Sequence, residues 1–119
     1  MGEYPLRERT KQLALRIIRL VEALPPGETS RVIGRQLLRS GTSVGANYRA
    51  SLRAKSKADM LNKWKIVEEE ADETLYWLEL LVDATIMPEA KLKPLMIEIE
   101  EILAMLVTSI KTLRADGRA

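Results

Sequence analysis

An acidic run in the second half of the chain gathers the side chains best suited to metal chemistry. Its members are Glu68, Glu69, Glu70, Asp72 and Glu73. Glu69 and Glu73 are four residues apart, so on a helix they share one face, as the carboxylate ligands of bundle metal sites do. The di-iron sites of such bundles also need histidine, which this chain lacks. We favour the interpretation of the acidic run as a solvated or salt-bridged helix face. The alternative is a site for a hard ion such as magnesium.

The absence of both histidine and cysteine narrows the chemistry further. It removes imidazole acid–base catalysis, thiol nucleophiles, disulfides and nearly every zinc or haem site. We therefore expect a protein that is not an enzyme and has no metal site and no cofactor. A carboxylate metal enzyme, based on the acidic run alone, is kept as an alternative.

Basic residues are concentrated in the first half of the chain. Residues 1–65 contain 14 Lys or Arg and 5 acidic residues, whereas residues 66–119 contain 5 basic and 12 acidic residues. A basic helix edge can bind a phosphate backbone by releasing condensed counterions. Alternatively, the cations are solvated or pair with the acidic half. The nucleic-acid-binding residues that we predict are Arg31, Arg35, Arg39, Arg49, Arg53, Lys55 and Lys57.

Small residues are gathered between Ser40 and Asn47. Gly41 and Gly45 lie four residues apart, on one helix face, where they let another helix approach closely. Glycine costs a helix about 1 kcal/mol relative to alanine, and we expect the close packing to offset that cost. A phosphate-binding glycine loop is disfavoured because the Lys-Ser/Thr ending of a P-loop is missing. We assign a structural role in helix packing to six residues: Gly41, Ser43, Gly45, Asn47, Glu69 and Glu73.

Four long amphipathic segments must position these side chains. Apolar residues at helical spacing, with prolines between the segments, predict helices over 6–24, 30–53, 57–85 and 89–114. The weak helix formers at 40–43 are expected to kink the second helix. Ser56 followed by Asp59 resembles a capping box at the start of the third. The chain is thus expected to be all-α, an antiparallel up-down four-helix bundle that forms one domain over 1–119.

The apolar stripes of these helices predict the buried core and an interface. The residues expected to be buried are Leu37, Val44, Trp64, Leu78, Ile99 and Leu106. Additional apolar positions predict a homo-oligomer, namely Leu75, Leu81, Val82 and Leu95. The aromatic residues Trp64, Tyr76 and Trp77 could stack on bases, but their helical spacing among leucines favours a core or interface role.

The same sequence predicts a cytoplasmic protein. The start, Met-Gly-Glu-Tyr-Pro, contains no apolar core of a secretory signal. The sequence also contains no run of about 18 uncharged apolar residues, the length needed to span a bilayer. We therefore expect no membrane partner.

The stretch LRSGTSVGANYRAS, followed by KADMLNKWKIVEEEADETLYWLELL, resembles the bacterial four-helix bundle proteins named after the intervening sequences of 23S ribosomal RNA. The resemblance covers residues 7–114. It rests on Arg39, Ser40, Gly41, Ser43, Val44, Ala46 and Asn47, and continues through Lys65, Glu69, Ala71, Glu73, Thr74, Tyr76, Trp77 and Leu78. One departure is Ala50, because members of this family commonly carry Glu soon after the Asn.

The resemblance implies an up-down bundle that assembles as a ring-shaped homopentamer. It also extends to the accessory proteins of diversity-generating retroelements, which are basic pentamers that bind nucleic acid and a reverse transcriptase. We therefore expect an oligomeric accessory protein that binds RNA or DNA and can assist a reverse transcriptase. A protein–protein scaffold without nucleic-acid binding is the alternative, indicated by the small-residue faces and the acidic second half.

Overall fold

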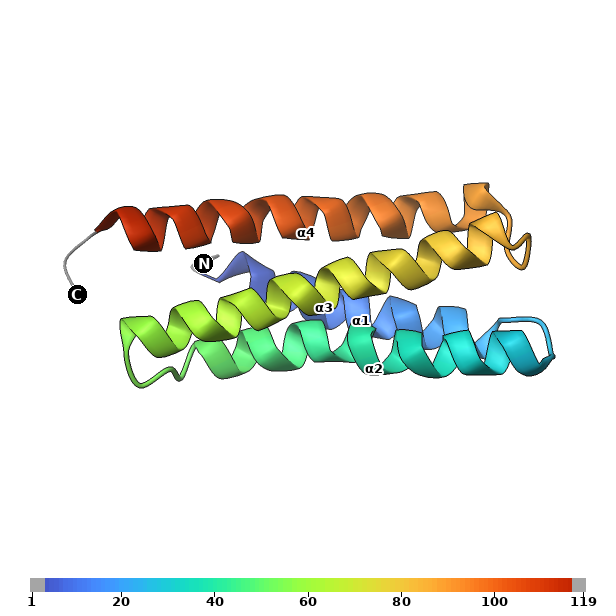
Figure 1. The fold of residues 1–119 in the computed structure, drawn as a ribbon, viewed down its shortest axis with the longest axis horizontal. Coiled ribbons are helices and arrows are strands. Elements are labelled where there is room, and N and C mark those ends of the chain that lie inside the picture. The colour runs from blue at the N-terminus through green and yellow to red at the C-terminus, as the bar shows by residue number, and fades with distance from the viewer. Residues whose placement is uncertain (1–3, 117–119) are drawn as a thin grey trace.

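The computed structural model describes residues 4–116 and consists of four α-helices joined by short connections. The helices are α1 (Pro5–Glu22), α2 (Glu28–Ser51), α3 (Lys57–Asp83) and α4 (Glu89–Asp116). They form an elongated bundle of 51 × 25 × 22 Å (Figure 1). No strand occurs within residues 4–116, so the expected all-α architecture is confirmed.

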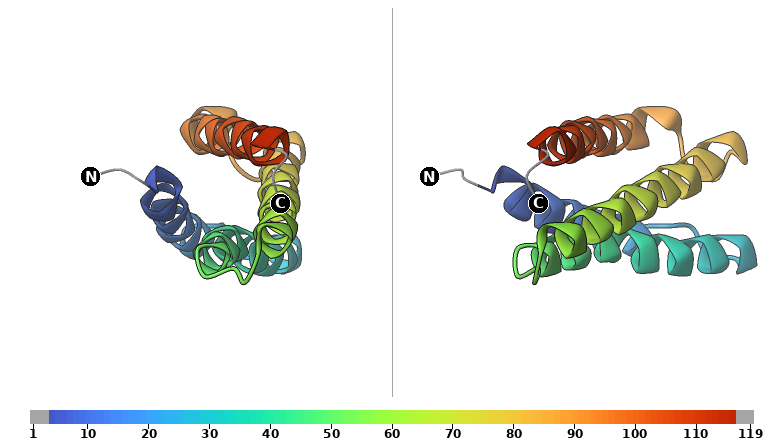
Figure 2. Two further views of the ribbon diagram at one scale, coloured as in Figure 1. Left: turned by 90° about the vertical axis from the view of Figure 1, so that its left-hand side faces the viewer. Right: turned by 60° about the vertical axis from the view of Figure 1, so that its left-hand side comes forward.

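Each helix packs against the helices before and after it in the chain. Seen end-on, the four helices follow one another around a square, with α1 and α4 closing it (Figure 2). Contacts join α1 to α2, α2 to α3, α3 to α4 and α4 to α1, and the α1–α4 contact is the sparsest. Short connections between such long helices force neighbours to run antiparallel. This is the predicted up-down bundle.

The helix boundaries lie within two residues of the predicted ones, and their local causes are visible. Gly27 has φ of 140°, a backbone conformation that favours glycine, and the second helix begins at the next residue. At the start of α3, the Asp59 backbone N–H donates to Ser56 Oγ at 3.0 Å, and the Lys55 N–H donates to Asp59 Oδ2 at 3.1 Å. The predicted capping interaction is therefore present. Thr85, with φ of 60°, follows the end of α3.

The predicted core is confirmed for five of its six residues. Leu37, Val44, Leu78, Ile99 and Leu106 are each 0% exposed. Trp64 is only partly buried: its indole packs against the core while its Nε1 donates to Ser51 Oγ at 3.0 Å. Indole N–H groups need such a partner when they leave water, and this places the ring at the margin of the core.

Two residues expected at an oligomer interface belong to the core of the single chain. Leu81 is 0% exposed and Leu95 is 5% exposed, so neither can contact a second copy. Leu75 and Val82 are partly buried against the same core. The wide apolar surface of the third and fourth predicted helices is thus largely consumed within the bundle.

The expected kink in α2 is not seen: the segment runs as one helix from Glu28 to Ser51 and has no sharp bend in Figure 1. A Cβ on Gly41 would lie 2.9 Å from two side-chain carbons of Ile17, and one on Gly45 would lie 3.1 Å from the Thr10 carbonyl oxygen. Tight packing against α1 holds this weak helix former in place. The Ser43 hydroxyl donates to the Arg39 carbonyl at 2.6 Å, within the helix.

Candidate nucleic-acid interface

Five exposed arginines lie along the outer face of α2 and just beyond its end. Arg31, Arg35, Arg39 and Arg49 are exposed because their positions on the helix point away from the buried stripe. Arg53, two residues after the last residue of α2, is exposed in the turn that follows. Lys55 is exposed in the connection to α3, and Lys57, at the first turn of α3, is partly buried. The structure therefore presents the seven sequence-predicted cations along one helix and the connection that follows it.

Three of these seven cations are neutralised by carboxylates. Arg31 pairs with Glu28 in its own helix, and Lys57 Nζ lies 3.6 Å from Asp116 Oδ2. Arg39 pairs across the α2–α3 contact with Glu73 and, at 3.3 Å, with Glu70. These partners reduce the attraction that the three cations exert on a phosphate.

The other four cations make no ion pair with any residue of 4–116. They are Arg35, Arg49, Arg53 and Lys55. Arg35 and Arg49 lie on α2, whereas Arg53 and Lys55 lie in the connection between α2 and α3. These are the members of the predicted set whose charge is most available to a ligand, although Lys55 also interacts electrostatically with Asp59.

The Arg39 cluster is built as a structural link between α2 and α3. The hydrogen bond from Arg39 lowers the pKa of the Glu73 carboxyl, and the Trp77 indole, which donates to Glu73 at 3.1 Å, acts in the same direction. Glu73 in turn raises the pKa of Arg39. The second carboxylate of the cluster is Glu70. Glu69, to which the four-residue spacing from Glu73 had assigned a structural role, is exposed and lies outside the cluster.

A pair of buried hydroxyls bridges α2 and α3, and an amide bonds within α2. The Thr74 and Ser40 hydroxyls, both 0% exposed, lie 2.9 Å apart between the helices. Asn47, partly buried, donates through Nδ2 to the Ser43 carbonyl at 2.9 Å. The residues on which the family resemblance rests thus lie mainly where α2 meets α1 and α3, and their contacts serve helix packing.

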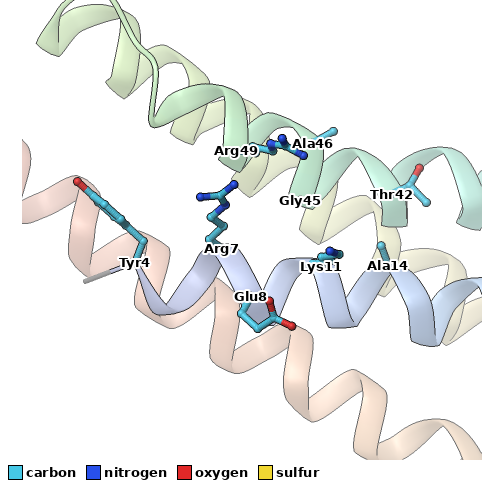
Figure 3. A pocket seen from close by; sticks show the side chains of 9 residues that line it. All are labelled: Tyr4, Arg7, Glu8, Lys11, Ala14, Thr42, Gly45, Ala46 and Arg49. Atoms are coloured by element: carbon cyan, nitrogen blue, oxygen red, sulfur yellow. The ribbon is translucent and has the colours of Figure 1, made fainter. Parts of the chain in front are cut away.

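A groove between α1 and α2 adds two cations that the sequence reasoning missed. Its volume is about 530 Å³ and it is lined by Tyr4, Arg7, Glu8, Lys11, Ala14, Thr42, Gly45, Ala46 and Arg49. Figure 3 shows the Arg7 side chain reaching from α1 toward α2, where the Arg49 side chain lies along the helix beside Ala46. Glu8 points away from the groove and accepts a hydrogen bond from Gln12 at 2.8 Å.

The groove has a net positive charge, because three cations line it together with a single carboxylate, that of Glu8. Arg7 and Lys11 are exposed, and like Arg49 they make no ion pair within residues 4–116. The small residues Gly45 and Ala46 also line the groove, and the missing Cβ of Gly45 lets the Thr10 backbone approach closely. The spacing of Arg7 and Lys11 by four residues was a signal in the sequence, but only the packing of α1 on α2 brings them opposite Arg49.

The opposite side of the bundle carries an acidic groove between α3 and α4. It has a volume of about 700 Å³ and is lined by Glu68, Glu69, Asp72, Glu100, Leu103, Ala104 and Val107. The carboxylates lie beside an apolar strip contributed by α4. Among residues 4–116, no three or more Asp, Glu, His or Cys side chains are grouped so as to hold a metal ion. None of the helices in this range is long and apolar enough to cross a bilayer.

Fold and surface together define a four-helix bundle with a basic face over α1 and α2 and an acidic groove over α3 and α4. The sequence of residues 3–108 matches the family model described as 23S rRNA-intervening sequence protein, so the chain belongs to that family. The fold is also similar to a crystal structure of a protein with unknown function from the S23 ribosomal protein family of Bacteroides thetaiotaomicron. The TM-score is 0.83 at 37% identity, over 88% of this chain and 97% of that one. No curated protein matches the chain.

Proposed function

We propose that this protein is a non-catalytic, oligomeric accessory protein that binds RNA or DNA through the face formed by α1 and α2. The observation that supports the proposal best is a set of six exposed cations on that side of the bundle, none paired with a carboxylate within residues 4–116. They are Arg7, Lys11, Arg35, Arg49, Arg53 and Lys55.

Phosphates are the groups that such a face recognises. Each phosphate neutralised by Lys or Arg releases condensed counterions, so affinity falls steeply as salt is added. Phosphates carry no base identity, and binding through them is therefore largely independent of sequence. In an oligomer the face recurs in every copy, and weak contacts add along one strand.

A double charge reversal tests the proposal. In Arg35→Glu/Arg53→Glu, binding of RNA and DNA in a gel-shift assay should weaken by about tenfold or more at low salt, since contacts are lost and repulsion is added. The matched control is Lys91→Glu/Lys111→Glu, which changes the net charge equally at exposed positions on α4. Equal binding by wild type and the first variant, with helical content unchanged, would show that the α2 cations are only a solvated face.

The acidic groove supports the oligomeric part of the proposal. Its carboxylates repel phosphates, so this side of the bundle is available for protein contacts while the basic face stays free. Leu103 and Val107 supply apolar surface there, and Ile97, also on α4, is 42% exposed. The number of copies, five, comes from the family resemblance.

A reverse transcriptase is the partner that the same resemblance suggests. Co-expression with a reverse transcriptase encoded beside this gene, followed by co-purification at moderate salt, tests that part of the proposal.

A protein–protein scaffold without nucleic-acid binding is the second candidate function. The acidic, apolar-floored α3–α4 groove favours it, because such a surface fits a cationic amphipathic partner. Failure of the wild-type protein to bind any nucleic acid at low salt would make this the leading interpretation.

A further inference from the structure

An exposed tyrosine lies among the residues that line the basic groove. Tyr4 directly precedes α1, is 53% exposed and lines the groove together with Arg7 and Arg49. The Arg7 backbone N–H donates to the Tyr4 carbonyl oxygen at 2.9 Å, and this bond fixes the tyrosine backbone against the first turn of α1. In Figure 3 the Tyr4 ring projects outward from the start of α1, on the same side of that helix as the Arg7 side chain.

An aromatic ring beside cations is what proteins use to hold unpaired bases. In single-strand binding sites, Lys and Arg follow the backbone while a base stacks on an aromatic face. A base inside a duplex is already stacked and paired, so its face is not available to a surface tyrosine. Cations alone would not distinguish a single strand from a duplex, whereas cations with an exposed ring do.

We propose that the α1–α2 groove is a single-strand-binding site, with phosphates on Arg7, Lys11 and Arg49 and one base stacked on Tyr4. This inference depends on the proposed nucleic-acid-binding function and specifies the kind of nucleic acid. The ring has no complementary hydrogen-bond pattern to read, so the site accepts RNA and DNA of any sequence. If all three cations are used, the log–log slope of affinity against salt is about −2, from roughly −0.7 for each phosphate of a single strand.

The chain contains a matched control for the tyrosine. Tyr76 is 52% exposed, almost the same as Tyr4, but it lies on α3 and packs edge-on against Trp77 with ring centroids 5.2 Å apart. Its neighbours in the chain include Asp72 and Glu73, so its surroundings repel phosphate. Replacing either tyrosine removes a similar exposed ring, and only one of them borders the basic groove.

The experiment compares fluorescence anisotropy of labelled 12-nucleotide single strands and of the corresponding duplexes, using the full-length protein. Tyr4→Ala should weaken single-strand binding by about fivefold or more, as expected for the loss of one stacked base. Duplex binding should be unchanged. Tyr4→Phe, which keeps the ring, should bind like the wild type, and so should Tyr76→Ala. Arg7→Ala/Lys11→Ala should weaken single-strand binding through loss of phosphate contacts.

The outcomes separate this inference from the function on which it depends. If the wild type binds nucleic acid but Tyr4→Ala binds single strands equally well, the stacking site is excluded and the nucleic-acid-binding function is kept. If Tyr4→Ala and Tyr76→Ala weaken binding equally, the effect is not local and the inference is wrong. If the wild type binds neither single strands nor duplexes, both proposals fail. Circular dichroism and thermal unfolding confirm that each variant is folded.

Discussion

Residues of one chemical type perform different tasks in this chain, depending on the partners that folding gives them. Arg9 joins α1 to α4: its Nη2 lies 2.7 Å from Glu98 Oε1 and 2.8 Å from Glu101 Oε1, and the hydrogen bond to Glu98 is the main cause of its raised pKa. Arg39 joins α2 to α3, whereas Arg35 has no ion pair within residues 4–116. The spacing of basic residues predicted the edge of α2, but it could not separate structural arginines from free ones, because their carboxylate partners are distant in the sequence.

The Arg39–Glu73 pair predicts a component of acid sensitivity. The folded-state pKa of Glu73 lies below its ordinary value of 4.5. A lowered carboxyl pKa contributes stability above the unfolded-state value, and that contribution is lost as the pH falls through the folded-state value. Urea unfolding from pH 7 down to pH 2 should therefore show a smaller loss of stability below about pH 4.5 in Glu73→Gln than in the wild type. Glu79→Gln, an exposed change on the same helix, is the control, and equal acid sensitivity of the two variants would contradict the assignment.

Gly41→Ala should destabilise the protein although alanine is the better helix former. The added Cβ would lie 2.9 Å from Ile17, which is 0% exposed and has no free space to move into. Overpacking of this kind costs about 1–3 kcal/mol, which opposes a propensity gain of about 1 kcal/mol. In the double variant Gly41→Ala/Ile17→Ala, the two losses should be less than additive, because alanine at position 17 lacks both Cγ atoms that the added Cβ would meet. Greater stability of the single variant in urea unfolding would show that α1 can shift away.

At the scale of elements, periodicity was enough to predict four helices and most of their buried faces. The stripe through Val67, Ala71, Thr74, Leu78 and Leu81 is buried in α3, and it contains hydroxyl and methyl groups as well as leucines. The kink expected at 40–43 is not seen because helix propensity is a local quantity, whereas packing of Gly41 on Ile17 is a tertiary one. The predicted helix ends differ from the observed ones by up to two residues. Periodicity does not fix the last turn of a helix, whereas single residues such as Gly27 and Thr85, both with positive φ, lie next to the observed ends.

The buried face of α3 can be tested by mutation of one of its leucines. Leu78→Ala should lower the free energy of unfolding by about 2–5 kcal/mol, the usual cost of lost burial plus a cavity. Leu78 is 0% exposed and belongs to the buried stripe of α3, so its truncation would leave a cavity in the core. Its neighbour Glu79 is exposed, and Glu79→Ala should change stability by about 0.5 kcal/mol or less. Similar values for the two variants in urea unfolding would mean that the stripe is misplaced.

For the whole molecule, folding converts a charge difference along the sequence into a difference between two sides of the bundle. α1 and α2 come from the basic half of the chain and α3 and α4 largely from the acidic half, and the ring order places each pair on its own side. The basic edge of α2 could be predicted from spacing alone. The α1–α2 groove could not, because Arg7 and Arg49 are separated by most of two helices and meet only after packing.

Assembly is the prediction that belongs to this scale. If the α3–α4 groove is buried between copies, light scattering of the wild type at micromolar concentration should give a multiple of the 13.5 kDa chain mass. Ala104→Glu adds a charge beside the apolar strip of that groove and should reduce the mass toward that of one chain, because a buried unpaired charge is strongly unfavourable. Ala104 is exposed in the single chain, so helical content should be kept.

Ala90→Glu is the matched control for this variant, since it introduces the same side chain at an exposed position of α4 outside the groove. A glutamate in the first turn of a helix is favourable, so this variant should be at least as stable as the wild type and keep its mass. A single-chain mass for the wild type would exclude the oligomer altogether. An unchanged oligomer in Ala104→Glu would instead locate the interface elsewhere on the bundle, and the acidic groove would then be open to another protein.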